Sequence, residues 1–398
     1  MSSPISRRLL SRRVLRFARL SLVAACALGL PAGAAAQSVQ ATQPAEGKPV
    51  ERLGPVSVHT AFGGFILGYD VDESGTQGVL AEALTLPNGT HTVAVETFDQ
   101  ATGKILKVVV KEEATKNDYL ALGIVGDGVG LIEFEHVTNL FVDQRLYFTM
   151  DPIEAGAFTD PWTPPLGVSD IITGVARSQG LSTAAVLGFH NGGNNDTFVL
   201  SSDVAANTFG PLILVTDPNF AANHSPTIAL DSSNGQAILA ALGPNPFGPP
   251  RLAKVSLASG AIHTFIGRGI GYVNGLAVDT ETGIACTSTE IDFRVEFYDL
   301  ADESGFTVVL PGAVSQAHSG QDVQLDPIHK LFLVGQPISS TAPEGSSIQV
   351  FDEQGHFVES INGLKLPASP ALMALNPSHR KGFVIRAPDL NELQSFTY

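Results

Sequence analysis

The chain has 398 residues, of which 44% are hydrophobic and 16% charged, and its formal net charge is −16. This composition is typical of a folded globular protein and excludes the disordered class, which is rich in charge and poor in apolar residues. The excess of 39 acidic over 23 basic residues excludes a non-specific nucleic-acid binder, whose surface is basic. With 40 Gly and 25 Pro and no collagen period, the sequence predicts many short strands and turns.

Residues 1–36 have the three parts of a secretory signal peptide. An apolar run follows a basic segment, and Ala34–Ala36 precede an expected cleavage before Gln37. The apolar run is interrupted by Gly29 and is too short for a transmembrane anchor, which needs about 20 apolar residues. We therefore expect a secreted or periplasmic bacterial protein without a transmembrane anchor in the mature chain. The basic residues of the segment are all arginines: Arg7, Arg8, Arg12, Arg13, Arg16 and Arg19.

Two other forms of export stay open. Ser11–Leu15 resembles a twin-arginine signal, and Val23–Cys26 resembles a lipobox that would anchor the protein by a lipid at Cys26. Cleavage at Ala36 removes Cys26 and leaves Cys286, so the mature chain has no internal disulfide, and we expect Cys286 to be buried and inert. Residues 37–54 are predicted to be a flexible linker.

One sequence unit recurs along the rest of the chain: an apolar strand that ends in Asp or Asn, a polar turn, and a second apolar strand. The intervals between the repeated Asp or Asn residues are 48, 47 and 50 residues. A fainter copy contains Asp72, and further copies are expected to begin near residues 126 and 178. The four clear copies are Ile228–Gly235, Leu276–Gly283, Val323–Lys330 and Met373–Arg380.

A second unit follows the first at a similar spacing and is typical of a tight hairpin. In each copy a strand ends in an acidic or polar turn whose glycine is expected to supply the positive φ. The four copies are Phe98–Gly103, Val255–Gly260, Tyr298–Gly305 and Phe351–Gly355. Two turns and four strands per ~50 residues predict the blades of a β-propeller.

The predicted fold is therefore an all-β propeller that occupies residues 55–398 as a single domain. Counting the repeats gives seven four-stranded blades, with six as the alternative. The last repeat holds only about two strands, Gly382–Arg386 and Leu393–Tyr398. We expect N-terminal strands within Pro55–Leu67 to complete that sheet and close the ring.

These repeats resemble the propeller family whose repeats are called YVTN or NHL, together with its gluconolactonase-like relatives. The matching features are the strand–Asp–turn unit and the Asp…Gly hairpin, and the resemblance is clear in residues 225–398. It implies a propeller fold but no fixed activity. The gluconolactonase-like relatives further imply a metal site at one mouth of the central channel.

Candidate site residues are expected where the blade-to-blade connections meet at that mouth. Carboxylates favour Ca²⁺ or Mg²⁺, whereas two imidazoles favour a transition metal, so the cofactor, if any, is predicted to be a divalent cation. The candidate metal ligands are Asp118, Asp170, His224 and His318. The candidate ligand-binding residues are His190, His224, Asn274, Glu290, His318 and Ser369.

Two functions remain possible from the sequence, and it does not decide whether the protein is an enzyme. The first is a binding module, expected to be monomeric, for a protein, a glycan or a small molecule. It would use the channel mouth or two Pro-rich loops, Phe158–Pro165 with Trp162 and Gly243–Pro250. The alternative is a metal-assisted, lactonase-like hydrolase or lyase with its site at the channel mouth. Common nucleophile and phosphate-binding motifs are absent from the sequence.

Overall fold

The computed structural model divides the chain into two compact units, Met1–Thr42 and Gln43–Tyr398, and the structure describes residues of the second unit only. The described part is residues 56–398, and the predicted signal peptide and linker lie outside it. It lacks residues 74, 86–90, 112–117, 126–128, 139–140, 151–164, 167–169, 178–182, 191–195, 204–205, 207, 221–225, 246, 290–292, 313–321, 338–345 and 368–372.

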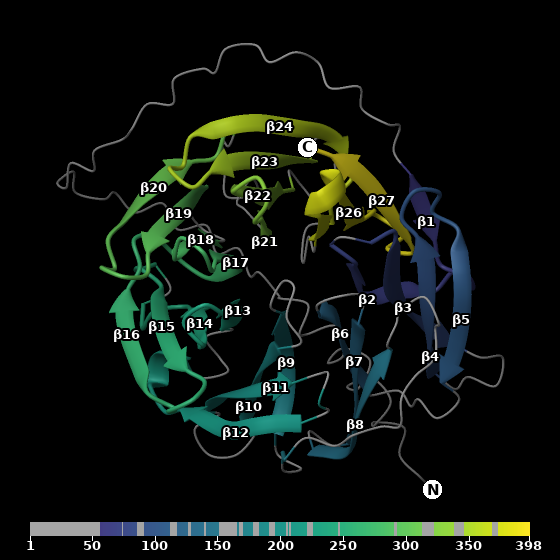
Figure 1. The fold of residues 1–398 in the computed structure, drawn as a ribbon, viewed down its shortest axis with the longest axis horizontal. Coiled ribbons are helices and arrows are strands. Elements are labelled where there is room, and N and C mark those ends of the chain that lie inside the picture. Colours follow the sequence, from purple (N-terminus) through teal and green to yellow (C-terminus); the bar gives the residue numbers. More distant parts are fainter. Residues whose placement is uncertain are drawn as a thin grey trace, which may run out of the picture. The chain divides into compact units, whose positions relative to one another are not determined.

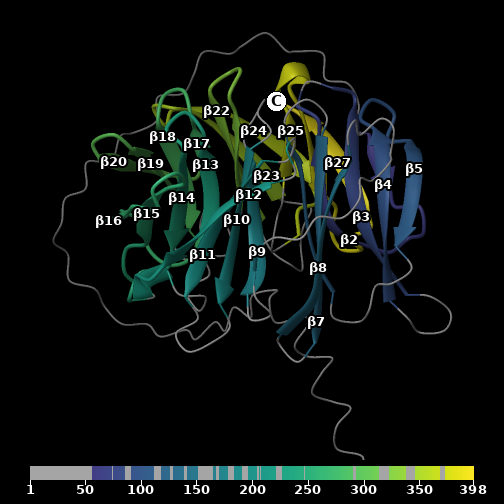
Figure 2. The ribbon, with the colours of Figure 1, turned by 60° about the horizontal axis from the view of Figure 1, so that its bottom comes forward.

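Seven antiparallel sheets of described strands stand around a central axis (Figure 1). Each innermost strand contacts the innermost strand of the next sheet, and the last contacts the first, so the ring is closed. Figure 2 shows these sheets from another side, standing on edge around the axis. The innermost strands are β2 (Phe65–Val71), β6 (Asp118–Val125), β9 (Asp170–Arg177), β13 (Thr227–Asp231), β17 (Val273–Asp279), β21 (Asp322–Asp326) and β25 (Met373–Asn376).

The remaining strands follow outward from each innermost strand, and hairpins connect them in chain order. β2 continues into β3 (Gln77–Thr85), β4 (His91–Asp99) and β5 (Ile105–Lys111); β6 into β7 (Val129–Thr138) and β8 (Phe141–Met150); β9 into β10 (Thr183–His190), β11 (Thr197–Asp203) and β12 (Thr208–Val215). β13 continues into β14 (Gln236–Ala241), β15 (Arg251–Ser256) and β16 (Ile262–Ile266); β17 into β18 (Ile284–Thr289), β19 (Arg294–Asp299) and β20 (Gly305–Val309). β21 continues into β22 (Leu331–Gln336), β23 (Ser346–Asp352) and β24 (Phe357–Leu364), and β25 into β26 (Lys381–Ile385) and β27 (Glu392–Thr397).

The all-β propeller predicted from the repeats is confirmed. Six of its sheets are four-stranded blades, the lower of the two predicted numbers, and β6–β8 form a further sheet with three described strands. The described residues form no α-helix, only two short 3₁₀ helices, Pro218–Phe220 and Pro377–His379.

The ring is closed by the pairing of strands from the two ends of the domain. β1 (Ser57–His59) pairs antiparallel with β27, with Val58 opposite Leu393. The predicted closure is therefore confirmed: Ser57–His59 is the strand that pairs, and Val56, Thr60 and Ile66 make further backbone hydrogen bonds to residues 390–395. The rest of the expected stretch differs because Phe65 already begins β2, the innermost strand of the first blade.

The repeated Asp or Asn is the last residue of an innermost strand, and its buried side chain caps the following turn. Asp326 accepts a hydrogen bond from the backbone N–H of His329 at 2.9 Å, and Asn376 accepts one from His379 at 3.3 Å. Asp231 and Asp279 make the same kind of contact three residues ahead. Short polar side chains favour such turns because they satisfy backbone donors locally.

The hairpin between the third and fourth strands requires one residue with positive φ at a fixed distance from the preceding polar residue. Gly103 has φ 72° and donates to the carbonyl of Asp99 at 2.8 Å. In the copy Tyr298–Gly305 the predicted glycine is wrong: Glu303 has φ 62° and donates to the carbonyl of Asp299 at 2.8 Å. In both hairpins the residue with positive φ is four residues after the Asp, because its N–H donates to the Asp carbonyl. Gly305 instead begins β20.

The core lies between neighbouring blades and consists of aromatic and branched side chains. Phe297 stacks on Phe306 and meets Phe332 and Phe351 edge-on, so one ring joins the blade of β17–β20 to the blade of β21–β24. Cys286 is buried in the same cluster, as expected, and burial raises the pKa of its thiol. Each buried phenylalanine stabilises the packing by roughly 1.5–3 kcal/mol.

Candidate functional site in the central channel

The innermost strands enclose a cavity of about 450 Å³ along the axis of the ring. This volume is within the range of small-molecule sites in proteins, which is roughly 300–1,000 Å³. Small residues make room for it, and Gly275 also allows β17 and β21 to approach closely. A Cβ atom at Gly275 would lie 2.7 Å from the backbone carbonyl carbon of Asp322, which is too close for any larger residue.

Asp322 begins β21 and is a carboxylate in the wall of this cavity, with 7% of its surface exposed. Its Oδ1 accepts from the backbone N–H of Val323 at 2.9 Å, and its Oδ2 accepts from the backbone N–H of Met373 at 2.8 Å. The side-chain amide of Gln324 donates to Oδ2 at 3.2 Å. Burial disfavours the ionised form and raises the pKa of Asp322 to about 6, although these donors act in the opposite direction.

Tyr69 lies near this carboxylate but directs its hydroxyl group into the neighbouring blade. Its Oη donates to the backbone carbonyl of Phe383 at 3.0 Å. Burial raises the pKa of Tyr69 well above its usual value, and the negative charges of Asp322 and Asp70 raise it further. The phenol is therefore neutral at physiological pH and serves as a fixed donor.

An ion-pair cluster stands where the innermost strands end. Arg177, the last residue of β9, lies 3.0 Å through its Nε from Oδ2 of Asp70, and 2.5 Å through its Nη1 from Oε1 of Glu73. Asp70 belongs to β2 and Glu73 follows it, while β6 stands between β2 and β9 in the ring. All three residues line the cavity, so this ion pair connects two non-adjacent blades across the channel wall.

The charge of Arg177 is well compensated by its surroundings. Burial alone would lower the pKa of the guanidinium group, but the charges of Asp70, Glu73 and Asp72 outweigh burial and raise it. The channel therefore differs in charge between its two ends. Where the innermost strands end, the charge of Arg177 is neutralised, and where they begin, Asp322 starts β21.

The structure places the predicted site residues as follows. Asn274, the second residue of β17, lines the cavity. Asp170 is buried at the start of β9, directly opposite His190 in the register of β9 and β10, but it does not line the cavity. Asp118 begins β6 and His190 ends β10, and only their backbones are described. His224, Glu290, His318 and Ser369 lie outside the described residues.

The predicted divalent-cation site and the lactonase-like alternative therefore stay predictions. Within the described ranges, no group of three or more His, Cys, Asp or Glu side chains is placed to hold a metal ion.

Asp70, Arg177, Asp322 and Gln324 line the channel and were not among the predicted site residues. Site residues were expected at the blade-to-blade connections, whereas Asp322 and Gln324 belong to β21 itself, four and two residues before Asp326. A charged residue inside an otherwise apolar innermost strand, as in Leu67–Val71, is the signal that could have found them. A side chain in such a strand has to be placed in the channel or paired in the core.

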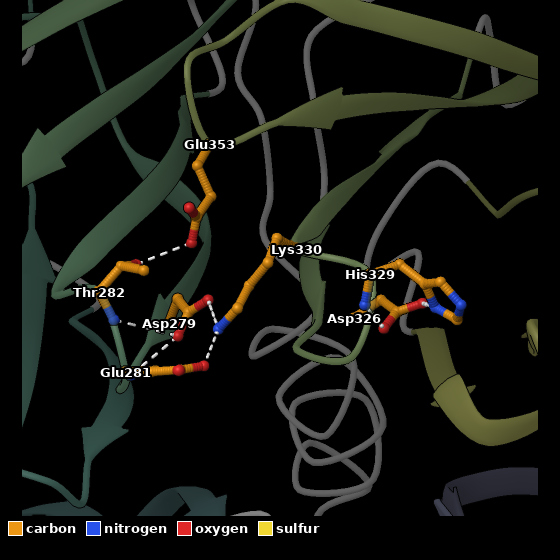
Figure 3. Close-up of polar contacts among 7 residues, drawn as sticks. All are labelled: Asp279, Glu281, Thr282, Asp326, His329, Lys330 and Glu353. Atoms are coloured by element: carbon orange, nitrogen blue, oxygen red, sulfur yellow. Dashed lines mark hydrogen bonds and ion pairs between the residues drawn. The ribbon is translucent and has the colours of Figure 1, made fainter.

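A second cluster of charges lies at the turns of two adjacent blades (Figure 3). Lys330 donates to Oδ2 of Asp279 at 2.8 Å and to Oε2 of Glu281 at 2.5 Å, and Thr282 donates to Oε1 of Glu353 at 2.7 Å. Burial would raise the pKa of Asp279, but hydrogen bonds with Glu353 and Lys330 hold it below its usual value. The cluster links the blade of β17–β20 to the blade of β21–β24 and lies outside the channel.

A third cluster supports the loop between β1 and β2. Glu82 of β3 and Glu96 of β4 are both fully buried. Glu96 accepts from the backbone N–H of Ala61 at 3.0 Å, and Glu82 accepts from the backbone N–H groups of Phe62, at 3.2 Å, and Gly64. Burial and a hydrogen bond with Glu82 raise the pKa of Glu96 to about 8, so a proton is retained between the two carboxyl groups at neutral pH.

Of the two Pro-rich loops, residues 158–164 lie outside the described part, whereas Gly243–Pro250 is described except for residue 246. Phe247 in this loop is 72% exposed. The loop is fixed by backbone bonds, since Gly267 donates to Pro250 at 2.9 Å and Gly271 donates to Gly248 at 3.2 Å. The aromatic ring is therefore exposed on a loop that backbone hydrogen bonds hold.

No known family model matches this chain, and the curated proteins contain no match to it. Among the described residues, no helix is long and apolar enough to cross a lipid bilayer.

Proposed function

We propose that this chain is an exported β-propeller that binds a small ligand in its central channel. The observation that carries the proposal is the cavity of about 450 Å³ into which polar side chains of several blades converge. Asp70, Arg177, Asn274 and Asp322 reach it from four different innermost strands. A concave site with apolar walls and a few convergent polar groups is the usual form of a small-molecule site.

The walls of the channel leave room for a ligand because several positions carry small side chains. Gly68, Gly275 and Ala277 line the cavity. At Gly174 an added Cβ would meet its nearest neighbours, Ile228 and Leu187, only at 3.8 and 4.0 Å. The cavity therefore accepts a larger side chain at Gly174 without a backbone clash.

Export and the repeat type belong to the same proposal. The segment 1–36, with its arginines, apolar run and Ala34–Ala36, supports a secreted or periplasmic location. The recurring strand–Asp–turn unit supports repeats of the YVTN or NHL type within the propeller. A binding role fits this fold, because the loops and channel of a rigid ring can vary without changing its packing.

A cavity-filling substitution tests the proposal. Gly174→Phe places a ring in the channel, whereas Thr264→Phe adds the same ring on the exposed outer strand β16 and serves as the matched control. We expect at least one of n-hexylamine, n-hexanol, hexanoate and glucose to bind the wild-type protein in ligand-observed NMR. Binding should be lost in Gly174→Phe and kept in Thr264→Phe.

The proposal is wrong if none of these four probes binds the wild-type protein, or if a bound probe is unaffected by Gly174→Phe. Circular dichroism and the unfolding temperature establish that both variants are folded.

A further inference from the structure

Among the acidic side chains that line the cavity, Asp322 differs in its partners. Its hydrogen-bond donors are two backbone N–H groups and the Gln324 amide, all of which are neutral. No cationic side chain of the described residues lies within ion-pair distance of it. By contrast, Asp70 and Glu73, the other two acids of the cavity wall, are both paired with Arg177.

A buried carboxylate without a counter-charge is costly, because the low-dielectric interior does not solvate it. Among the described residues that line the cavity, Asp70, Glu73 and Asp322 are acidic and Arg177 is basic. Since Arg177 is held by the first two acids, its charge is not available to Asp322. Among the described residues, therefore, no positive charge compensates the carboxylate at the start of β21.

The surroundings of Asp322 fit an ammonium group better than a metal ion. A Ca²⁺ ion takes six to eight oxygen ligands, whereas both carboxylate oxygens of Asp322 already accept hydrogen bonds from N–H groups. An ammonium group needs only a few acceptors and forms a charge-assisted hydrogen bond to a carboxylate. The same cavity has an apolar wall for an alkyl chain, formed by side chains that include Leu67, Ile228 and Met373.

We propose that the central channel binds an aliphatic primary amine, with its ammonium group on the Asp322 carboxylate and its alkyl chain against the apolar wall. This inference rests on the proposed function of the channel and names its ligand class. In this arrangement Asp322 gives the specificity for an ammonium group, and the small and apolar residues of the innermost strands accommodate the alkyl chain.

Binding of the amine should depend on pH through Asp322. Among the described residues, the groups near its carboxylate are Tyr69 from β2, Gln324 from its own strand and the backbone N–H of Met373 from β25. Tyr69 stays neutral, and Asp70 and Arg177 are paired with each other. With the pKa of Asp322 at about 6, the carboxylate is mostly ionised at pH 7.5 and mostly protonated at pH 5.

The test is isothermal titration calorimetry of the full-length protein with n-hexylamine and with its neutral counterpart n-hexanol. At pH 7.5 we expect hexylamine to bind about tenfold more tightly than hexanol, the effect of one charge-assisted hydrogen bond. Asp322→Asn should remove this preference. Glu281→Gln, which removes a negative charge from a residue that is 79% exposed and outside the cavity, should keep it.

The wild-type protein provides a second test that does not require the Asn variant to fold. Between pH 7.5 and pH 5 hexylamine affinity should fall about tenfold, because the amine stays charged with a pKa of about 10.4, as in lysine, while Asp322 takes up a proton. Hexanol affinity should not change in the same way.

Equal binding of hexylamine and hexanol at both pH values overturns the ammonium inference and leaves channel binding intact. Binding of hexylamine that survives Gly174→Phe places the amine outside the channel and also overturns it. If neither hexylamine nor hexanol binds, this inference fails, and the proposed function fails as well if hexanoate and glucose also do not bind.

Discussion

One turn position with positive φ recurs in this propeller, and in two blades a side-chain contact offsets its backbone strain. The last residue of the turn before a second strand has positive φ in four blades: Gly235, Gly283, Lys330 and Arg380. Glycine takes this conformation without strain, whereas for other residues the left-handed conformation costs about 1 kcal/mol. Lys330 compensates by bonding Asp279 and Glu281 of the preceding blade, and Arg380 does so by lying over the ring of Tyr398.

Replacing Lys330 separates these two effects. Lys330→Met loses the ion pairs, leaves Asp279 without its cation and keeps the backbone strain, so we expect the free energy of unfolding to fall by about 1–3 kcal/mol. Lys330→Gly also loses the ion pairs but relieves the strain, so its loss should be smaller by about 1 kcal/mol.

Urea unfolding measures both variants, together with Glu281→Gln, which removes only the exposed half of the ion-pair cluster and should change stability by less than about 0.5 kcal/mol. A Lys330→Met protein as stable as the wild type would contradict a stabilising role for this ion pair.

Residue patterns in the sequence were sufficient to predict the turns but not the residues that line the channel. The repeated Asp of Asp231, Asp279 and Asp326 could be recognised because a turn cap must occur at a fixed point of every repeat. Asp322 could not, since it has no counterpart at the same position of the other blades and acts through contacts with β25. A contact made between blades leaves no periodic signal in one sequence.

At the scale of elements, the connection between β1 and β2 decides how the ring is closed. β1 belongs to the last blade and β2 to the first, and the loop between them is held by Glu82 and Glu96 from β3 and β4. The sequence predicted that the chain ends would meet in one sheet. It did not predict where β1 ends, because the carboxyl groups that fix residues 61–64 lie about 20 to 35 residues further along the chain.

The closure should weaken as the pH rises. The folded-state pKa of Glu96 is about 8 and thus above its unfolded value, so the folded protein binds more protons between these two values. The contribution of this group to stability is complete below the unfolded pKa and is lost as the pH rises to about 8. We expect the free energy of unfolding to decrease between pH 6 and pH 9, and to decrease less in Glu96→Gln.

Urea unfolding at a series of pH values measures this slope, and Glu281→Gln should keep the slope of the wild type because its side chain is largely exposed. A wild-type slope that is identical in Glu96→Gln would contradict the shared proton.

At the scale of the whole molecule, the ring of sheets creates the space that the proposed function requires. Seven innermost strands contact one another in turn, and their small residues leave a cavity where acidic groups outnumber basic ones. The net charge of the whole sequence is negative, like that of the cavity. Cleavage of the predicted signal peptide would remove all six arginines of residues 1–36 and no acid, and would change the charge from −16 to −22. Such a protein attracts cationic ligands and repels anionic ones over a long range.

The central claim is that the channel of this propeller binds an aliphatic amine, and a crystal structure of the protein grown with n-hexylamine tests it most directly. The account predicts density for the amine within the ring, with its nitrogen at hydrogen-bond distance from the carboxylate of Asp322 and its chain along Leu67 and Met373. A channel that holds only solvent, or an amine bound outside the ring, would contradict it.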